Sequence, residues 1–335
     1  MTDVPQGAQY LRKLSVVVAN AAGNGIDFAE FRVTFSVRRG DSQTPNSADV
    51  RIFNLAPHLA NQLATNASEF TQIQIQAGYQ NAQYGLIFSG TVKQYRKGRV
   101  DQKDSFIDIT AADGDSAYNF AAISLTLAAN SAYDQGVAGF AASMAAKNIE
   151  PPLYISNLPN LKKTYVRGRV FYGMTRDELR DFCATNNLTW SIQDGRLLLL
   201  PTTGYLAANP VPVIGVATGL IGVPEQTQQG ITFRCLLNPN IKVGSLVKLD
   251  SGDINRLRFG VDQASVGAQA GLLKQIDTSA DGLYYVMDMS HTGDSRGEEW
   301  YTDALCLKTD AKITSRTPLP QGGISPDGVP AYGTY

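Results

Sequence analysis

The chain has 335 residues, enough for two or three domains, and 43% of them are hydrophobic, which is ample for a buried core. Its 29 basic and 30 acidic residues give a formal net charge of -1, which argues against a protein that grips nucleic acid through phosphates. Only 18% of residues are charged, so the surface is rich in Gln, Asn, Ser and Thr, and this favours a subunit with much buried interface over a free enzyme.

Cysteine usage and apolar run lengths limit the setting of the protein. Cys183, Cys235 and Cys306 are far apart and lie in apolar or strand-like surroundings, which predicts buried thiols and neither a disulfide nor a metal site. We find no secretory signal and no apolar stretch near the roughly 20 residues that span a bilayer. We therefore expect no membrane anchor and a protein kept in the cytoplasm until assembly.

Alternation of apolar and polar residues dominates the first 115 residues and predicts antiparallel strands. The predicted strands cover 14–18, 31–37, 49–55, 72–79, 85–92 and 106–111, with a charged hairpin at 97–101. Residues 56–63 place a proline near a first helical turn and predict one short helix. A small closed or nearly closed β-barrel with one helix is the simplest package for these elements.

Asp113, Gly114 and Asp115 follow the last of these strands. Two carboxylates beside a glycine suggest calcium, but Tyr118, Asn119 and Phe120 follow where a calcium loop needs further oxygen ligands. A turn with an aspartate cap for a helix at 116–121 is the better explanation. We predict no metal and no cofactor.

The middle of the chain predicts two helices and a hairpin. Residues 131–147 have helical spacing with Ser131 as the cap, and Thr175 with Glu178 fits a capping box that starts the second helix. Residues 188–192 and 196–200 flank an Asp-Gly turn, which predicts a hairpin. Together these elements form a compact α/β unit.

The last third of the chain returns to strand patterns. The runs 230–237 and 241–249 are separated by Asn238, Pro239 and Asn240, and we expect them to pair as antiparallel neighbours. Two further strands are predicted over 282–291 and 300–307, after the weakly patterned residues 251–277. From residue 317 onward Pro and Gly dominate, so we expect an extended tail or one ordered by a partner.

Candidates for catalysis are few. His58 follows a proline at a predicted helix start and should lie on the surface, while His291 ends a strand beside Gly293. Nucleophile-elbow, zinc-protease and phosphate-loop motifs do not occur. Glu298 and Glu299 are adjacent in a strand-like setting and would point to opposite faces, so they cannot flank one glycosidic bond. We predict a protein that is not an enzyme.

The stretch from Leu220 to Asp250, together with Gly219 before it, resembles a segment of phage baseplate hub proteins. The resemblance rests on Gly219-Leu220-Ile221-Gly222 with Pro224, on a Gly-Ile strand from Gly230, on the Leu236-Leu237-Asn238-Pro239 turn, and on Val243-Gly244. It continues through 111–115 and 285–294. The family-motif and interface candidates are Gly222, Pro224, Leu237, Asn238, Pro239, Gly244, Asp113, Gly114, Gln72, Gln74 and Gln76.

This resemblance implies an α+β, mainly β fold: two tube-type antiparallel β-barrel domains with a small α/β insertion between them. The implied parts are a first barrel at 1–115, the insertion at 116–202, a second barrel at 203–315 and an extended tail at 316–335.

It further implies a structural baseplate hub of a contractile-tailed phage, related to the spike hubs of type VI secretion. Such a hub forms a homotrimeric ring that joins the hexameric tail tube protein to the central spike protein and contacts other baseplate proteins. DNA meets the hub only in transit, no cofactor is involved, and the location is the virion tail after assembly in the host cytoplasm. Gln72, Gln74 and Gln76 would line the lumen or a subunit contact.

Two alternatives stay open at this point. One is a cell-wall-degrading or carbohydrate-binding tail protein on two β domains. The other is the corresponding hub of a tailocin or secretion particle, which would use the same parts.

Overall fold

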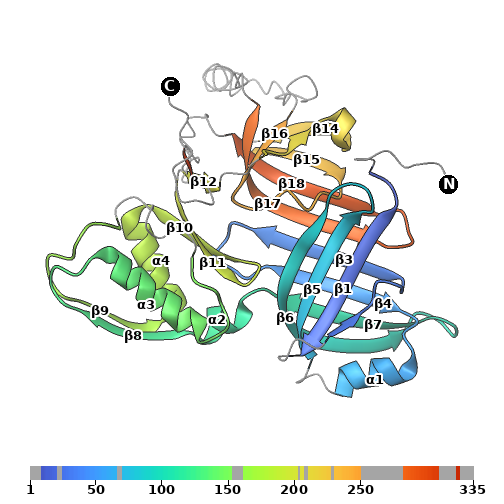
Figure 1. The fold of residues 1–335 in the computed structure, drawn as a ribbon, viewed down its shortest axis with the longest axis horizontal. Coiled ribbons are helices and arrows are strands. Elements are labelled where there is room, and N and C mark those ends of the chain that lie inside the picture. The colour runs from blue at the N-terminus through green and yellow to red at the C-terminus, as the bar shows by residue number, and fades with distance from the viewer. Residues whose placement is uncertain are drawn as a thin grey trace, which may run out of the picture.

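The computed structural model describes residues 9–20, 25–65, 70–152, 161–202, 204–206, 210–227, 230–249, 282–308 and 322–324. Its fold is mainly β, with antiparallel sheets and few helices, as the sequence predicts (Figure 1). Within the described residues, the helices are all too short or too polar to cross a membrane.

One large sheet of thirteen strands organises the molecule. Its main path runs β14-β15-β18-β17-β3-β4-β7-β6-β5-β1-β2, and β16 pairs with both β17 and β13. The strands are β1 Arg12–Asn20, β2 Gly25–Asp27, β3 Val33–Gly40, β4 Ser47–Phe53, β5 Phe70–Tyr79, β6 Tyr84–Arg99, β7 Ser105–Ala112, β13 Val213–Ile214, β14 Leu220–Thr227, β15 Gly230–Leu236, β16 Leu246–Leu249, β17 Leu283–Asp294 and β18 Trp300–Lys308.

The first half of this sheet curls over itself. Strands β1, β5 and β6 cross in front of β3, β4 and β7 (Figure 1). The alternation of β3 places Val33, Phe35 and Val37 in the core between these layers, because successive side chains of a strand point to opposite faces. Helix α1 (Pro57–Thr65) adds the buried Leu63 to the same core.

The two closed barrels that the resemblance implies are not seen among the described strands. The main path is open, with β14 at one end and β2 at the other. Strand β3 pairs with β17 over seven residue pairs, from Thr34 with Asp294 to Gly40 with Asp288. This pairing merges the two halves into one sheet.

The predicted hairpin between 230–237 and 241–249 is wrong. Strand β15 pairs instead with β14 and β18, while β16 pairs with β13 and β17. The reason lies after β15, where the Leu237 amide donates to the Trp300 carbonyl and the Asn238 amide donates to Thr302 Oγ1. These bonds keep the chain against β18 past the end of β15, so it cannot fold back on β15.

The α/β part has a core of its own (Figure 1). Its elements are α2 Asp115–Phe120, β8 Ala122–Leu127, α3 Tyr133–Ala145, β9 Arg169–Met174, α4 Thr175–Asn186, β10 Leu188–Gln193 and β11 Arg196–Pro201. Strands β10 and β11 form the predicted hairpin. Strand β8, which pairs with β9, was not predicted, although Ile123, Leu125 and Leu127 alternate with polar residues along it.

The three predicted helix caps are wrong. Helices α2, α3 and α4 begin after Gly114, Ala132 and Met174, and none of these residues gives a side-chain cap. Thr175 is buried instead, and its hydroxyl lies 2.8 Å from the hydroxyl of Ser143 on α3. The Thr175 hydroxyl, which would cap the helix locally, instead forms a hydrogen bond with a residue of another helix.

Two smaller elements complete the described chain. Residues 216–218 form a 3₁₀ turn, and strand β12 (Gly204–Leu206) pairs in parallel with β19 (Gly322–Ile324). The expectations for 251–277 and for the rest of 316–335 lie outside the described residues.

Candidate functional site

Two groups of five strands in the large sheet follow the same plan. We call β3-β4-β5-β6-β7 unit A and β14-β15-β16-β17-β18 unit B. In each unit the first strand pairs with the second, the second with the fifth, the fifth with the fourth and the fourth with the third, always antiparallel. Both fourth strands are also irregular at the same step of their pairing with the fifth, after Val92 in β6 and after Val286 in β17.

The same ion pair occurs at the same position of both units. When the two irregular steps are aligned, Arg51 matches Arg234 and Asp108 matches Asp303. In each pair Nε lies 2.6 Å from Oδ1 and Nη2 lies 3.1 Å from Oδ2. This two-pronged contact needs the planar guanidinium of arginine. Units A and B are therefore two copies of one structural motif within the chain.

The units are joined where β17, the fourth strand of unit B, pairs with β3, the first strand of unit A. The rings of Phe35 and Trp300 meet edge to face behind this joint, with centroids 5.5 Å apart. At its end, Arg32 Nη2 donates to Asp294 Oδ2 at 2.7 Å. The orientation of the units is thus fixed by a ladder, a buried aromatic pair and an ion pair.

One face of the joined sheet is polar and carries two shallow grooves, one over unit A and one mainly over unit B. The basic groove residues are Arg38, Arg51, Arg96 and Arg234, and the acidic ones are Asp49, Asp108, Glu225, Asp288, Glu299 and Asp303. Six carboxylates face four guanidiniums, so the grooves carry more negative than positive charge.

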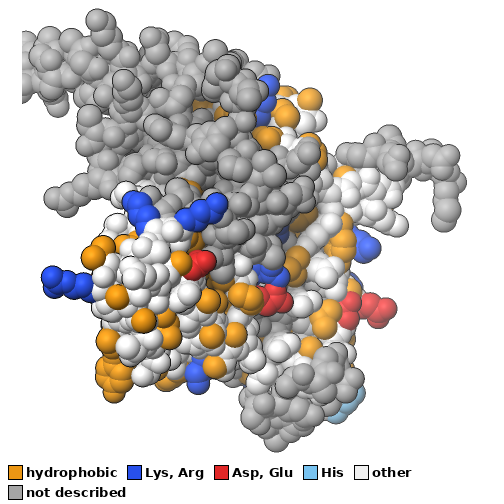
Figure 2. Space-filling view, turned by 60° about the vertical axis from the view of Figure 1, so that its left-hand side comes forward, with side chains coloured by type: hydrophobic (Ala, Val, Ile, Leu, Met, Phe, Trp, Pro, Cys, Tyr) orange, Lys and Arg blue, Asp and Glu red, His pale blue; other side chains and the backbone are white. Residues whose placement is uncertain are grey.

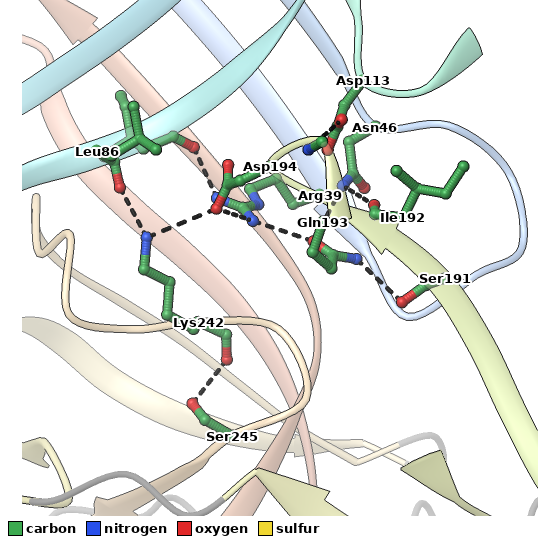
Figure 3. Close-up of polar contacts among 12 residues, drawn as sticks. Arg39, Asn46, Leu86, Asp113, Ser191, Ile192, Gln193, Asp194, Lys242 and Ser245 are labelled. Atoms are coloured by element: carbon green, nitrogen blue, oxygen red, sulfur yellow. Dashed lines mark hydrogen bonds and ion pairs between the residues drawn. The ribbon is translucent and has the colours of Figure 1, made fainter. Parts of the chain in front are cut away.

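A buried polar cluster joins the sheet to the α/β part (Figure 3). The side chain of Arg39, on β3, is only 2% exposed. Its Nη1 donates to the Ile87 carbonyl at 2.9 Å, and its Nη2 donates to Asp194 Oδ2 at 2.8 Å and to Gln193 Oε1 at 3.1 Å. A buried guanidinium with several acceptors holds its surroundings in one arrangement.

The turn between β10 and β11 is held further by two side-chain amides. Asn46 Nδ2 donates to the Ile192 carbonyl at 2.9 Å, and Gln193 Nε2 donates to the Gly40 carbonyl at 2.9 Å. The segment from Gly40 to Asn46 therefore forms hydrogen bonds with the backbone of the turn as well as with its side chains.

Lys242 brings unit B into the same cluster (Figure 3). Its Nζ donates to the Leu86 carbonyl at 2.7 Å and lies 4.0 Å from Asp194 Oδ2. Burial, with a smaller contribution from the charge of Arg39, lowers the pKa of Lys242 to about 8. Unit A, unit B and the α/β part thus meet at one point.

Asp113 and Gly114, both predicted motif residues, lie at this junction. Asp113 is 1% exposed and its Oδ1 accepts the Gly195 amide at 2.8 Å, while burial raises its pKa to about 6. Gly114 has φ 73°, and a Cβ there would lie 2.6 Å from Ile192 Cγ2. Asp115 pairs with Lys93 instead, so the two carboxylates turn to different partners.

The Leu-Asn-Pro motif closes unit B onto unit A. Leu237 is fully buried in the core of unit A. Asn238 Oδ1 accepts the Asn240 amide at 3.0 Å, which forms an Asx turn. Pro239 is buried and lies 3.5 Å from where a Cβ of Gly85 would stand. The motif is therefore a packing device between the units.

The remaining glycine and proline candidates lie in two places. Gly244 has φ 83°, and a Cβ there would lie 3.2 Å from Leu200 Cδ1, so unit B packs closely against β11. Gly222 has φ 73° and lies in the irregular part of β14, with open space around its Cα; Pro224 beside it is buried.

Gln72, Gln74 and Gln76 lie on β5, in the layer across the core from the polar face. Gln72 and Gln74 are exposed and Gln76 is half-buried. The structure therefore separates these residues from the junction and from the grooves.

The outer side of the α/β part exposes apolar groups. Phe120, Val166, Val170 and Tyr172 are all exposed. Figure 2 shows orange side chains spread over this part of the molecule. Because exposed apolar surface favours contact with other proteins, this side is a candidate interface.

The histidines occupy different settings. His58 is exposed at the start of α1, as predicted. His291 is fully buried on β17 with Nδ1 2.9 Å from Thr302 Oγ1, and burial lowers its pKa to about 3. A neutral imidazole closed off from solvent cannot exchange protons with a substrate. The three cysteines are buried thiols, as predicted.

Arg39, Asn46 and Gln193 form the junction, yet the sequence did not single them out. Arg39 did leave a signal, because it occupies an inward position after Val33, Phe35 and Val37 on β3. A charge at such a position predicts a buried partner, but its identity depends on a turn far along the chain.

The family model described as baseplate hub gp41 matches residues 14–257. No curated protein matches the chain. Among solved structures, the chain is similar to the 43 kDa tail protein of prophage MuSo2 from Shewanella oneidensis, at 8% identity and TM-score 0.54, over 89% of this chain and 99% of that one.

Two further structures share the fold. The tail protein from Neisseria meningitidis MC58 has 10% identity and TM-score 0.52, over 89% of this chain and 97% of that one. A chain of the half-lidded Francisella PdpA-VgrG complex has 7% identity and TM-score 0.54, over 95% of this chain and 61% of that one. These likenesses concern the fold alone. Since the family model matches most of the chain, the protein belongs to the baseplate hub gp41 family and is a structural component of a phage tail baseplate.

Proposed function

We propose that three copies of the chain form a ring that joins the hexameric tail tube to the central spike of a contractile tail. The observation that carries this proposal is the repeat of units A and B, with its matched Arg-Asp pairs. Three chains supply six similar units, which suits a sixfold tube on one side and a threefold spike on the other. In this proposal the chain consists of a first tube-like domain at 1–115, the α/β insertion at 116–202, a second tube-like domain at 203–315 and a C-terminal tail at 316–335.

We assign the polar face of the sheet to the channel through which DNA passes during ejection. Arg51 and Arg234 are paired with aspartates, Arg96 shares Asp108 with Arg51, and carboxylates outnumber guanidiniums along the grooves. Phosphates would find few free cations there, so DNA could slide without being held.

The outward surfaces are left for partners. Other baseplate proteins would contact Gln72 and Gln74 on β5 and the apolar side of the α/β part. In this proposal the assembly takes place in the host cytoplasm. The similar Francisella chain was solved as part of a PdpA-VgrG complex, which supports assembly with further tail or spike components.

We further propose that the protein has no catalytic role. The buried, neutral His291 and the separate partners of Asp113 and Asp115 support this. The cell-wall-degrading alternative requires convergent carboxylates in a deep cleft, whereas the two grooves are shallow and their Asp108 and Asp303 are paired with arginines.

The test is the mass of the purified protein by light scattering, with and without its candidate spike protein. A mass near three times 36.1 kDa, alone or on adding the spike, is the expected result. A protein that stays monomeric under both conditions and cleaves peptidoglycan would overturn the proposal.

A further inference from the structure

One face of the β8-β9 pair is packed and the other is exposed. On the packed face, Phe171 of β9 is buried and its ring meets that of Phe140 on α3, with centroids 5.0 Å apart. On the other face, Val170 and Tyr172 are 60% and 78% exposed. Strands β8 and β9 run along the outer margin of the α/β part, away from the large sheet (Figure 1). The exposed face therefore lies where another protein can reach it.

The segment that leads into β9 is basic. Lys162, Lys163, Arg167 and Arg169 are all exposed, and Val166 between them is 88% exposed. Residues 116–133 and 151–175, which include both strands, contain these four basic residues and no acidic residue. The whole chain has 29 basic and 30 acidic residues, so this positive charge is a local concentration.

These four cations form no ion pair with any described residue, Asp134 at the start of α3 included. The ion pairs on the surface of the α/β part use other cations, namely Arg176, Arg180 and Arg196. Arg169 lies over the ring of Phe171 instead, 5.3 Å from its centroid. Cations without paired carboxylates give this surface a positive potential, which attracts an acidic partner.

The basic segment is held in place by backbone bonds to the start of α3. The Tyr133 amide donates to the Lys163 carbonyl at 2.9 Å, and the Tyr165 amide donates to the Ser131 carbonyl at 2.9 Å. The rings of Tyr133 and Tyr165 have centroids 4.3 Å apart. A segment that is fixed in advance loses little conformational entropy on binding.

We propose that the outward face of β8-β9 and the basic segment 162–169 together bind an acidic segment of another baseplate protein. This inference deepens the proposed function, in which other baseplate proteins contact the apolar side of the α/β part. Carboxylates of the partner pair with the cations, and an apolar side chain of the partner packs on Val170 and Tyr172. An apolar centre with a polar rim is the usual anatomy of a protein interface.

The hydroxyls of the exposed face favour a protein over a lipid surface. Ser124 lies opposite Tyr172, and Thr126 lies opposite Val170, so each exposed apolar side chain has a hydroxyl beside it. Insertion into hydrocarbon would bury these hydroxyls without hydrogen-bond partners, whereas a protein segment supplies carbonyl and carboxylate acceptors. A nucleic acid would use the cations through its phosphates but would leave Val166 and Val170 against water.

A photo-cross-linker at position 172 tests the identity of the partner in assembled tails. The full chain carries p-azidophenylalanine in place of Tyr172 and is assembled into tails in host cells, and the purified tails are irradiated. Mass spectrometry then maps the linked peptide. We expect a link to a different tail protein, with Asp or Glu within about five residues of the linked position, which is the length of one strand.

The matched control carries the same group in place of Asp181, which is exposed on α4, and should not link to that segment. Val170 lies on the same face as Tyr172, so it serves as a second position if substitution at 172 keeps the protein out of tails.

A charge reversal tests the electrostatic half of the inference. Combined with the cross-linker, Lys163→Glu/Arg167→Glu should lower the yield of the link roughly tenfold, because like charges that face each other across an interface repel. The neutral variant Lys163→Gln/Arg167→Gln should lower the yield less. Replacing the carboxylates of the linked segment by lysine should restore the yield with the Glu variant. Circular dichroism of each variant checks that its fold is unchanged.

The outcomes separate this inference from the proposed ring. A link to an acidic segment that is lost on charge reversal and restored by the exchange supports the surface. A link to DNA, to lipid, to another copy of this chain or to a segment without acidic residues overturns it, as does a yield that charge reversal leaves unchanged. A mass near three chains by light scattering with no link at 172 or 170 overturns the surface and leaves the ring standing. A monomer that still links to an acidic tail protein does the reverse.

Discussion

The guanidinium of Arg39 on β3 donates to the carboxylate of Asp194 in the β10-β11 turn at 2.8 Å, across 155 positions of sequence. The Arg39 side chain is almost fully buried, so its charge is stabilised by this carboxylate and by neighbouring carbonyl oxygens. The pair therefore ties the sheet to the α/β part.

Removing this guanidinium should destabilise the protein strongly. Arg39→Met leaves Asp194 without its main partner, and breaking a buried pair on one side costs about 3–5 kcal/mol. Because Asp194 keeps 23% side-chain exposure, we expect a loss near the lower end of that range, measured by urea unfolding. The control is Arg180→Met, which removes an exposed pair with Asp177 and should cost less than about 1 kcal/mol. Equal losses would contradict the prediction.

Asp113 should make the protein relatively more stable in mild acid. Its pKa is raised to about 6 in the folded state, against about 3.9 when unfolded, so the folded state binds more protons between these values. The free energy of unfolding therefore gains from this group as pH falls from about 6 to about 4.

Asp113→Asn keeps an acceptor for the Gly195 amide but cannot titrate. Relative to the unchanged protein, we expect this variant to lose on the order of 1–2 kcal/mol between pH 7 and pH 4.5 in urea unfolding. His291 acts in the opposite direction, but it is common to both proteins and cancels in the difference. Parallel pH profiles would show that Asp113 does not titrate in this window.

Gly244 should tolerate alanine much less well than Gly222 does. Both have positive φ, so both variants carry the backbone penalty of about 1 kcal/mol. A Cβ at Gly244 also presses on Leu200 at 3.2 Å, whereas at Gly222 it meets nothing within 4 Å. We expect Gly244→Ala to lose roughly 1–3 kcal/mol more than Gly222→Ala, measured by urea unfolding. A larger loss at Gly222 would contradict the packing described for β11.

The three thiols should be unreactive in the folded protein. Burial raises the pKa of Cys183 and of Cys235 to about 12, and it raises that of Cys306 as well. A colourimetric thiol reagent should label none of them at pH 8 and all three after denaturation. Rapid labelling of one cysteine in the native state would locate a region that opens.

The sequence by itself determined most strands and their inward faces. Alternation identified β1, β3 and β5, and the Asp-Gly turn identified the β10-β11 hairpin, because these signals depend only on neighbouring residues. It also indicated the family through short turn motifs, of which the Leu237-Asn238-Pro239 turn packs unit B against unit A. The helix caps failed for the complementary reason: the hydroxyl of Thr175 is bound by Ser143, a residue of another helix.

Only the tertiary structure decided which strands pair. Every strand offers the same backbone donors and acceptors, so the choice between β16 and β18 as the partner of β15 depends on what packs behind them. Phe35 against Trp300, and Asn238 against Thr302, fix that choice across long stretches of sequence. The joint between β3 and β17 depends on these contacts. At Arg39 the alternation of β3 indicates a buried charge, but only the tertiary structure brings Asp194 to it.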